Sequence, residues 1–184
     1  NGEIVGTIDN SASQGGDDPV NNPGVYTVEI IATDPEAGTV TETFTWTVIN
    51  PAPIAEDDDF TMTEDDNPIS GDLHADNGSG DVDRDPDLDD FDITLVNGSA
   101  ANVNNAVTGS MGGTFTINTD GTFNFDPGTS FQDLDVGEDR ITTATYTIDY
   151  GEGGTSQATV SVTVTGLTAI PKVVDPNDPN PHPD

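Results

Sequence analysis

Two stretches early in the chain carry the apolar/polar alternation of a β-strand, and this alternation constrains the fold more than any other feature. They span residues 25–33 and 40–48. Successive side chains of a β-strand point to opposite faces of a sheet, so each stretch is predicted to be a strand, with a turn at residues 34–38. A third, shorter strand is predicted over residues 3–8. The side chains expected to face a core are Val40, Phe44, Trp46 and Val48, while the threonines between them face water.

Strand patterns continue along the chain as far as Thr165. Asp120-Gly121 separates two short alternating runs, and Asp-Gly in that position is the strongest short signal for a β-hairpin. Residues 140–149 and 155–165 form another alternating pair. No stretch shows a convincing 3.6-residue apolar period, as an amphipathic helix would. The predicted fold class is therefore all-β, built from tandem antiparallel β-sandwich modules.

Pro51 and Pro53 mark the clearest boundary in the chain. Proline cannot donate a ladder hydrogen bond, so residues 51–55 are predicted to be a linker. Residues 1–50 carry too few strands for an independent sandwich and are interpreted as a partial β-module, completed by a preceding segment or by a neighbouring copy. Residues 56–166 are predicted to form a full sandwich, and the Pro- and Asp-rich residues 167–184 an extended linker.

The charge of the chain is strongly one-sided. Asp and Glu number 35 against 3 Lys and Arg, which gives a formal net charge of -32 on 184 residues. A compact chain of this charge repels itself, and bound divalent cations relieve the repulsion directly. A nucleic-acid partner is excluded, because a phosphate-binding surface needs clustered Lys and Arg. Disorder is the alternative interpretation, but the aromatic and β-branched strand patterns favour a folded chain with acidic loops.

Cysteine is absent, which excludes disulfides, thiolate catalysis and Cys-based zinc sites. A secreted domain without disulfides needs another source of rigidity, and Ca²⁺ is the expected one. No apolar stretch approaches about 18 residues, so membrane insertion by this segment is not expected.

The densest group of candidate metal ligands lies within residues 72–90. Its centre, residues 81–87, places a carboxylate at every second position, and alternate side chains of an extended backbone project to the same side. Several oxygens can then converge on a hard cation such as Ca²⁺. An EF-hand is excluded, because Pro86 stands where that loop requires Gly. A solvated acidic loop is the alternative. The predicted ligands here are Asp76, Asn77, Asp81, Asp83, Asp85 and Asp87.

A second acidic group follows the linker, and more acids come one short strand later. The turn at residues 34–38 carries two further acids that could approach this group. A cation between the two modules would stiffen their joint, whereas the alternative is strand-edge charge that prevents aggregation. The candidate ligands of this second group are Glu56, Asp57, Asp58, Glu64, Asp65, Asp34 and Glu36.

Catalytic patterns are missing. The chain has no G-x-S-x-G, no H-E-x-x-H and no glycine-rich phosphate loop. His74 is the only histidine outside the Pro-rich tail, and carboxylates are so numerous that finding a pair of them carries no information. Asp-Pro bonds, which some self-cleaving modules cut, are also common turn dipeptides. We therefore expect that the protein is not an enzyme.

Between Pro53 and Gly166 a series of short pieces follows one another in a recognisable order. They are residues 53–59, 63–68, 71–77, 81–87, 91–98, 120–125, 134–138, 145–151 and 153–166. In this order they resemble the VCBS-type and related cadherin-like repeats of large bacterial RTX-type surface adhesins. Through residues 24–28, 32–34 and 44–51, residues 1–50 look like the later half of a cadherin-like or Ig-like repeat. One departure is Asp85-Pro86-Asp87, which replaces the more usual Asp-Gly-Asp.

This resemblance implies tandem β-sandwiches of Ig-like or cadherin-like type, calcium at loops and joints, and a location outside the cell on a bacterial surface. The expected role is a calcium-binding stalk or spacer module in cell adhesion, whose partners are neighbouring repeats or copies of the same protein. Two alternatives stay open. One is a filament subunit assembled by strand exchange between copies. The other is an adhesion module that binds a glycan or a protein.

Overall fold

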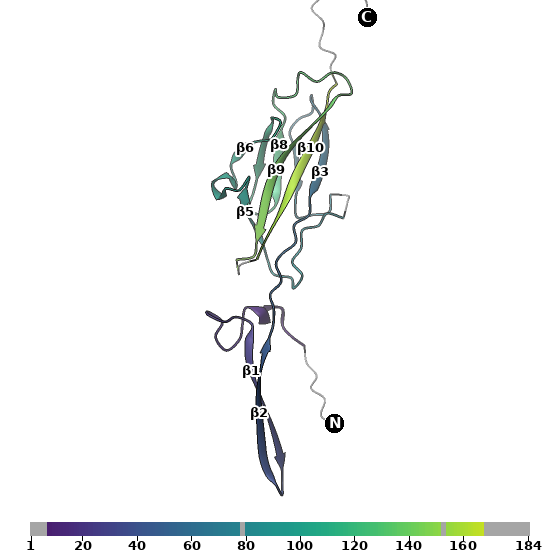
Figure 1. Ribbon diagram of the computed structural model, residues 1–184. Coiled ribbons are helices and arrows are strands. Elements are labelled where there is room, and N and C mark those ends of the chain that lie inside the picture. The colour runs from purple at the N-terminus through teal and green to yellow at the C-terminus, as the bar shows by residue number, and fades with distance from the viewer. Residues whose placement is uncertain (1–6, 78–79, 152–153, 168–184) are drawn as a thin grey trace, which may run out of the picture.

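The computed structural model describes residues 7–77, 80–151 and 154–167. A β-hairpin lies at one end of the molecule and a β-sandwich at the other, with an extended connection between them (Figure 1). The described residues form ten strands and two short 3-10 helices, without an α-helix. None of the helices described is long and apolar enough to cross a membrane. The all-β prediction is confirmed.

The hairpin consists of β1 (Val25–Asp34) and β2 (Gly38–Thr47), preceded by the 3-10 helix η1 (Asn10–Ser13). The strands pair antiparallel from Val25↔Thr47 at the linker end to Asp34↔Gly38 at the tip. Both predicted strands and the turn between them are therefore present. Thr7 and Ile8 belong to no strand, and the rest of the strand predicted over residues 3–8 lies outside the described residues.

One face of the hairpin is apolar and open. Tyr26 lies opposite Trp46, and Val28 lies opposite Phe44. Trp46 remains 48% exposed, Phe44 44% and Val40 63%, so the prediction that these side chains face a core is not met within the described residues. The physical reason is that two strands alone do not enclose a core.

The first sheet of the sandwich has the order β3-β10-β9-β5. Its strands are β3 (Asp58–Thr63), β5 (Asp92–Val96), β9 (Asp139–Asp149) and β10 (Thr155–Thr165). The pairs β9–β10 and β5–β9 are antiparallel. The pair β3–β10 is parallel, with Val160 opposite Asp58, so the sheet is mixed and not wholly antiparallel as predicted.

The second sheet has the order β4-β8-β7-β6 and is antiparallel throughout. Its strands are β4 (Ile69–Asp72), β6 (Ala106–Thr108), β7 (Thr114–Ile117) and β8 (Thr122–Asp126), and η2 (Ala100–Asn102) precedes β6. The predicted Asp120-Gly121 hairpin joins β7 to β8. Gly121 has a φ of 82°, which a residue without Cβ adopts at little cost.

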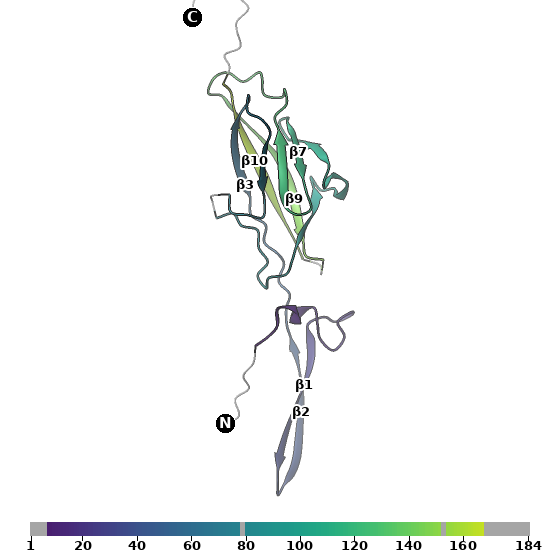
Figure 2. The same cartoon turned by 180° about the vertical axis from the view of Figure 1, so that it is seen from behind.

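The core lies between these two sheets, which Figure 2 shows from behind. Alternate side chains of β9 and β10 are buried, as their sequence pattern predicts. The largest fully buried side chains are Tyr146, Phe115, Phe125, Phe131, Leu73, Ile93, Ile117, Ile148, Val96, Val160, Val162 and Val164. Burying this much apolar surface stabilises the sandwich and fixes the loops at its hairpin-facing end.

Candidate metal centre

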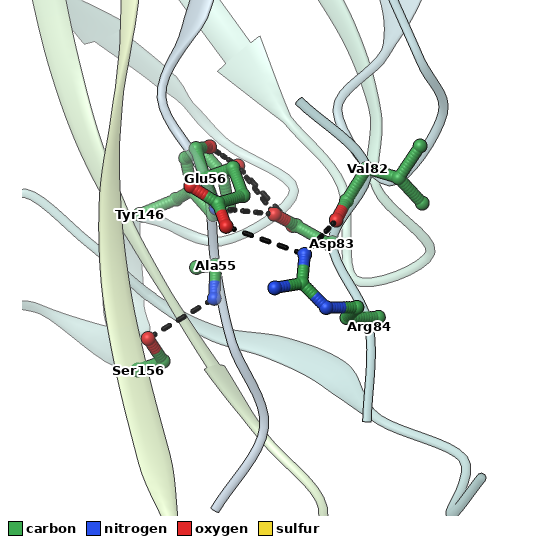
Figure 3. A network of polar contacts seen from close by, with 7 residues as sticks. All are labelled: Ala55, Glu56, Val82, Asp83, Arg84, Tyr146 and Ser156. Carbon is green, nitrogen blue, oxygen red and sulfur yellow. Dashed lines mark hydrogen bonds and ion pairs between the residues drawn. The ribbon is translucent and has the colours of Figure 1, made fainter. Parts of the chain in front are cut away.

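A long acidic loop connects β4 to β5 and crosses the end of the sandwich that faces the hairpin. It is attached to the linker by a short antiparallel bridge, in which Ile54 N donates to Arg84 O over 2.8 Å and Arg84 N donates to Ile54 O over 3.0 Å. The Arg84 side chain turns outward to Glu56, 3.3 Å away (Figure 3). The bridge therefore brings the acids of the loop next to those that follow the linker.

The loop is extended here, and its side chains alternate between inside and outside. Asp81, Asp83 and Asp85 are only 5%, 4% and 5% exposed, whereas Val82 and Arg84 between them are exposed. Carboxylates at every second residue thus point the same way, as the spacing predicts. They separate into two groups, an inner cluster (Asp58, Asp81 and Asp83) and a joint cluster (Asp85, Asp87 and Asp89).

The inner cluster surrounds a buried tyrosine. The Tyr146 hydroxyl lies 3.1 Å from Asp83 Oδ2 and 3.0 Å from the Glu56 carbonyl oxygen (Figure 3). It also lies 2.9 Å from Asp58 Oδ2. Asn77 Nδ2 donates to Asp58 Oδ1 over 2.7 Å, and Asn77 N donates to Asp81 Oδ1 over 2.8 Å. A hydroxyl has a single proton to donate, so several oxygens crowd one donor.

Burial changes the acidity of this cluster. Removal from water raises the pKa of Asp58 to about 7, although hydrogen bonds from Tyr146 and Asn77 oppose the change. Burial likewise raises the pKa of Asp83 to about 6. Burial also raises the pKa of the Tyr146 hydroxyl, so this group stays protonated and acts as a donor. The carboxyl groups of Asp58 and Asp83 in the inner cluster therefore take up protons at a pH closer to neutral than ordinary aspartates do, and they share the one proton of the Tyr146 hydroxyl.

The joint cluster is built differently. One carboxylate oxygen from each of Asp85, Asp87 and Asp89 lies within 4.8 Å of the others. Asp87 N and Asp89 N both donate to Asp85 Oδ1, over 3.1 and 3.3 Å, which curls the loop around that side chain. The contact with the Asp85 carboxyl, followed by burial and the charges of Asp85 and Asp89, raises the pKa of Asp87 to about 6. Three acids are therefore held together against their repulsion.

Two oxygens of the joint cluster have no hydrogen-bond partner among the described residues. They are Asp85 Oδ2 and Asp87 Oδ1, and both are buried. A buried carboxylate oxygen left unsatisfied is costly, and the usual remedy is a proton or a cation. The donor set is all oxygen, without sulfur or imidazole, which is the chemistry of Ca²⁺ rather than of zinc. The residues present therefore fit calcium.

The hairpin part and the linker also reach this cluster. Ser13 Oγ, at the end of η1, donates to Asp87 Oδ2 over 3.4 Å, and Gln14 Nε2 donates to Asp89 Oδ2. The side-chain amide of Asn50 lies against Asp87 Oδ2 and Asp89 Oδ2. Residues from both sides of the linker therefore converge at one place.

The predicted ligands are distributed unevenly over these two clusters. Asp58, Asp81, Asp83 and Asn77 meet in the inner cluster, where Glu56 contributes its backbone. Asp85 and Asp87 belong to the joint cluster.

Two further predicted ligands lie outside both clusters as defined. Asp76 Oδ1 accepts from Gly80 N, and Asp57 Oδ1 accepts from Thr159 N of β10. Both side chains are exposed.

Four other predicted ligands lie away from the inner cluster and the joint cluster. Asp34 and Glu36 lie at the hairpin tip, where Asp34 Oδ1 accepts from Glu36 N, so the turn does not approach the acids after the linker. Glu64 and Asp65 follow the far end of β3, and Glu64 Oε1 accepts from Leu167 N. A strand of ten residues is about 34 Å long, which is why the tip stays far from the linker.

Several residues of the site were not among the predicted ligands. Asp89 continues the every-second-residue spacing of the loop, and that spacing could have identified it. Asn50 directly precedes the linker, where the joint was expected. No local signal identifies Tyr146, Ser13 or Gln14, because their roles depend on how distant segments pack.

Comparison with known proteins identifies a family for the sandwich. A family model described as "Bacterial cadherin-like domain" matches residues 50–166, more than half of the chain. No curated protein matches.

Two solved structures are similar in part. One is a nucleoside hydrolase-related hypothetical protein from Saccharophagus degradans, associated with carbohydrate metabolism, with a TM-score of 0.38, 16% identity and coverage of 65% of this chain and 26% of the other. The other comprises extracellular cadherin domains 1–4 of protocadherin gamma B7, with a TM-score of 0.37, 14% identity and coverage of 78% and 32%. The chain thus spans at most about a third of either structure, and the family match over the sandwich and its acidic loop carries the assignment: the chain belongs to the bacterial cadherin-like domain family.

Proposed function

We propose that this protein is a calcium-binding structural module of an extracellular bacterial surface protein, where it serves as a spacer in cell adhesion. The observation that carries the proposal is the joint cluster, in which Asp85 Oδ2 and Asp87 Oδ1 are buried without a partner. Membership of the cadherin-like family supports an extracellular repeat or adhesion module. The net charge of -32 further favours a role for bound cations.

Asp85, Asp87 and Asp89 would hold the ion, with Asn50 supplying an amide group from the linker. A bound Ca²⁺ would neutralise negative charge on these buried carboxylates. Ser13 and Gln14 attach the hairpin part to the same acids, so the site would resist bending at the linker. A spacer requires this stiffness, because a flexible joint shortens the distance that the module spans.

The expected gain in stability is modest. Extracellular modules bind calcium with dissociation constants of roughly 10⁻⁴ to 10⁻³ M. At ten times the dissociation constant, one site adds about 1.4 kcal/mol to the free energy of unfolding. Thermal melts in excess chelator and in millimolar Ca²⁺ measure this difference, and we expect the melting temperature to be several degrees lower in chelator.

Asp85→Asn and Asp59→Asn form a matched pair for this test. Both remove one negative charge, but Asp85 belongs to the joint cluster whereas Asp59 is exposed on β3. We expect Asp85→Asn to abolish the calcium-dependent rise in melting temperature and Asp59→Asn to retain it. Equal melts of the native protein with and without calcium would contradict the proposal, and so would equal behaviour of the two variants.

The open face of the hairpin favours a second, compatible role. Trp46, Phe44 and Val40 are 48%, 44% and 63% exposed on one face of a two-stranded sheet. We propose that this face contacts a neighbouring repeat or another copy of the same protein, which includes the case of a filament. Sedimentation velocity of the native chain and of Trp46→Ser over a range of concentrations tests self-association. Monomeric behaviour of the native chain up to high concentration would exclude the filament.

A further inference from the structure

The side-chain amide of Asn50 can occupy its place in two orientations that differ in chemistry. With the nitrogen toward the joint cluster, Nδ2 lies 2.9 Å from Asp87 Oδ2, 3.2 Å from Asp89 Oδ2 and 3.2 Å from Ser13 Oγ. With the two ends exchanged, the carbonyl oxygen takes that place. The shape is the same in both cases, but one orientation presents hydrogen-bond donors and the other an acceptor.

Hydrogen bonding favours the nitrogen-inward orientation when only protein atoms are considered. Ionised carboxylates accept and cannot donate, so an amide oxygen in the same place would face other acceptors. With the nitrogen inward, the Asn50 oxygen points outward and accepts from Tyr150 OH over 3.2 Å and from Gln14 Nε2 over 3.3 Å. Both ends of the amide are then satisfied, and its N–H groups place partial positive charge against two acids.

The oxygen-inward orientation suits a joint cluster that holds a cation. Amide carbonyl oxygens are ligands of Ca²⁺, whereas an N–H₂ group directed at the same place repels a cation. Calcium binding would thus require the oxygen of the Asn50 amide to face the cluster, and hydrogen bonding to the protein alone disfavours that orientation.

We propose that Asn50 reverses its side-chain amide with the occupancy of the joint cluster: nitrogen inward without a cation and oxygen inward with one. This inference rests on the proposed calcium binding and adds to it a reversal of one side chain that opposes binding. The Asn50 N–H groups would take the place of a cation beside these acids and compete with it, which weakens binding. Gln14 contributes to this competition, because its Nε2 group can only donate and therefore stabilises only the nitrogen-inward orientation, whereas the Tyr150 hydroxyl can donate to the Asn50 oxygen or accept from its nitrogen.

Nuclear magnetic resonance of the whole chain observes the amide directly. The Asn50 side-chain N–H₂ resonances, assigned as those lost in Asn50→Ala, are expected to show hydrogen-bonded shifts and slow solvent exchange in chelator. Addition of Ca²⁺ is expected to move them toward free-amide positions and to accelerate their exchange roughly tenfold or more, since charge-assisted hydrogen bonds are then lost.

The failures of the two proposals are distinguishable. A calcium titration that shifts the backbone resonances of residues 85–89 but leaves the Asn50 side chain unchanged overturns the reversal and retains the calcium site. A titration that leaves the entire spectrum unchanged overturns both. An Asn50 amide that exchanges rapidly in chelator also overturns the reversal, because the nitrogen-inward hydrogen bonds would then be absent.

Discussion

The hydroxyl of Tyr146, in the middle of β9, lies 2.9 Å from Oδ2 of Asp58, the first residue of β3. Both residues are 0% exposed. Because β3 and β9 are not adjacent in their sheet, this contact joins strands that backbone hydrogen bonds do not connect. The same hydroxyl lies 3.1 Å from Asp83 Oδ2, so it also anchors the acidic loop.

Replacing Tyr146 by Phe should destabilise the sandwich by about 1–3 kcal/mol, because it leaves buried carboxylate oxygens without their donor. Urea unfolding in chelator, followed by circular dichroism, measures this loss. Tyr26→Phe is the control, since the Tyr26 hydroxyl donates to Ala12 O in the hairpin part. It is expected to leave the midpoint of the sandwich unchanged, and equal midpoints for both variants would contradict the importance of the Tyr146 contact.

Stability without calcium should depend on pH through Asp58. Burial raises the pKa of Asp58 to about 7, so the folded state binds its proton more tightly than the unfolded state does. The stabilisation that comes from this proton is fully present below the unfolded pKa of about 3.9 and is lost as the pH rises through the folded pKa. From Asp58, we therefore expect stability in chelator to fall as the pH rises from about 4 to about 7, the interval between the unfolded and folded pKa values, and to level off above it.

Asp58→Asn is the matched variant for this prediction, because the asparagine side chain has nearly the same shape as that of aspartate and does not titrate. Urea midpoints at several pH values should show a smaller fall for the variant than for the native chain. Asp83, whose pKa burial raises to about 6, accounts for part of the remaining slope at lower pH. An identical pH dependence of the two proteins would exclude Asp58 as its source.

Alternation along the chain is sufficient to predict most strands and the shared orientation of Asp81, Asp83 and Asp85, because both follow from the two-residue period of an extended backbone. It does not predict that this side of the loop is the buried one. It cannot predict that Tyr146 meets Asp58, since that contact joins residues 88 positions apart. It also cannot show that the apolar face of β2 stays exposed within the part of the chain that the structure describes. The expectation that Asp34 could approach the acids after the linker was wrong, because pairing along two ten-residue strands places the turn at the far end of the hairpin.

Gly121→Ala should be more damaging than an ordinary substitution at a turn. A Cβ at Gly121 would lie 2.6 Å from His74 Cγ, and the φ of 82° is itself unfavourable for alanine. Gly98→Ala is the control, with a φ of 73° and nothing within 4 Å of its Cβ. The backbone alone costs about 1–2 kcal/mol at both positions. We expect a further loss of about 1–3 kcal/mol at Gly121, where the contact forces His74 to move. Equal unfolding midpoints for the two variants would contradict this contact.

Phe125 and Trp46 should differ sharply when each is replaced by Ala, although both are aromatic residues in strands. Phe125 is 0% exposed and packs against Phe115 and Phe131, so Phe125→Ala should cost the sandwich about 3–5 kcal/mol. Trp46 is 48% exposed on the open face of the hairpin, so Trp46→Ala should change the unfolding of the sandwich by less than about 0.5 kcal/mol. Urea unfolding followed by circular dichroism compares the two without relying on tryptophan fluorescence, because Trp46 is the only tryptophan of the chain. A large loss on replacement of Trp46 would mean that the hairpin and the sandwich unfold as one unit, since the exposed side chain has no core of its own to disrupt.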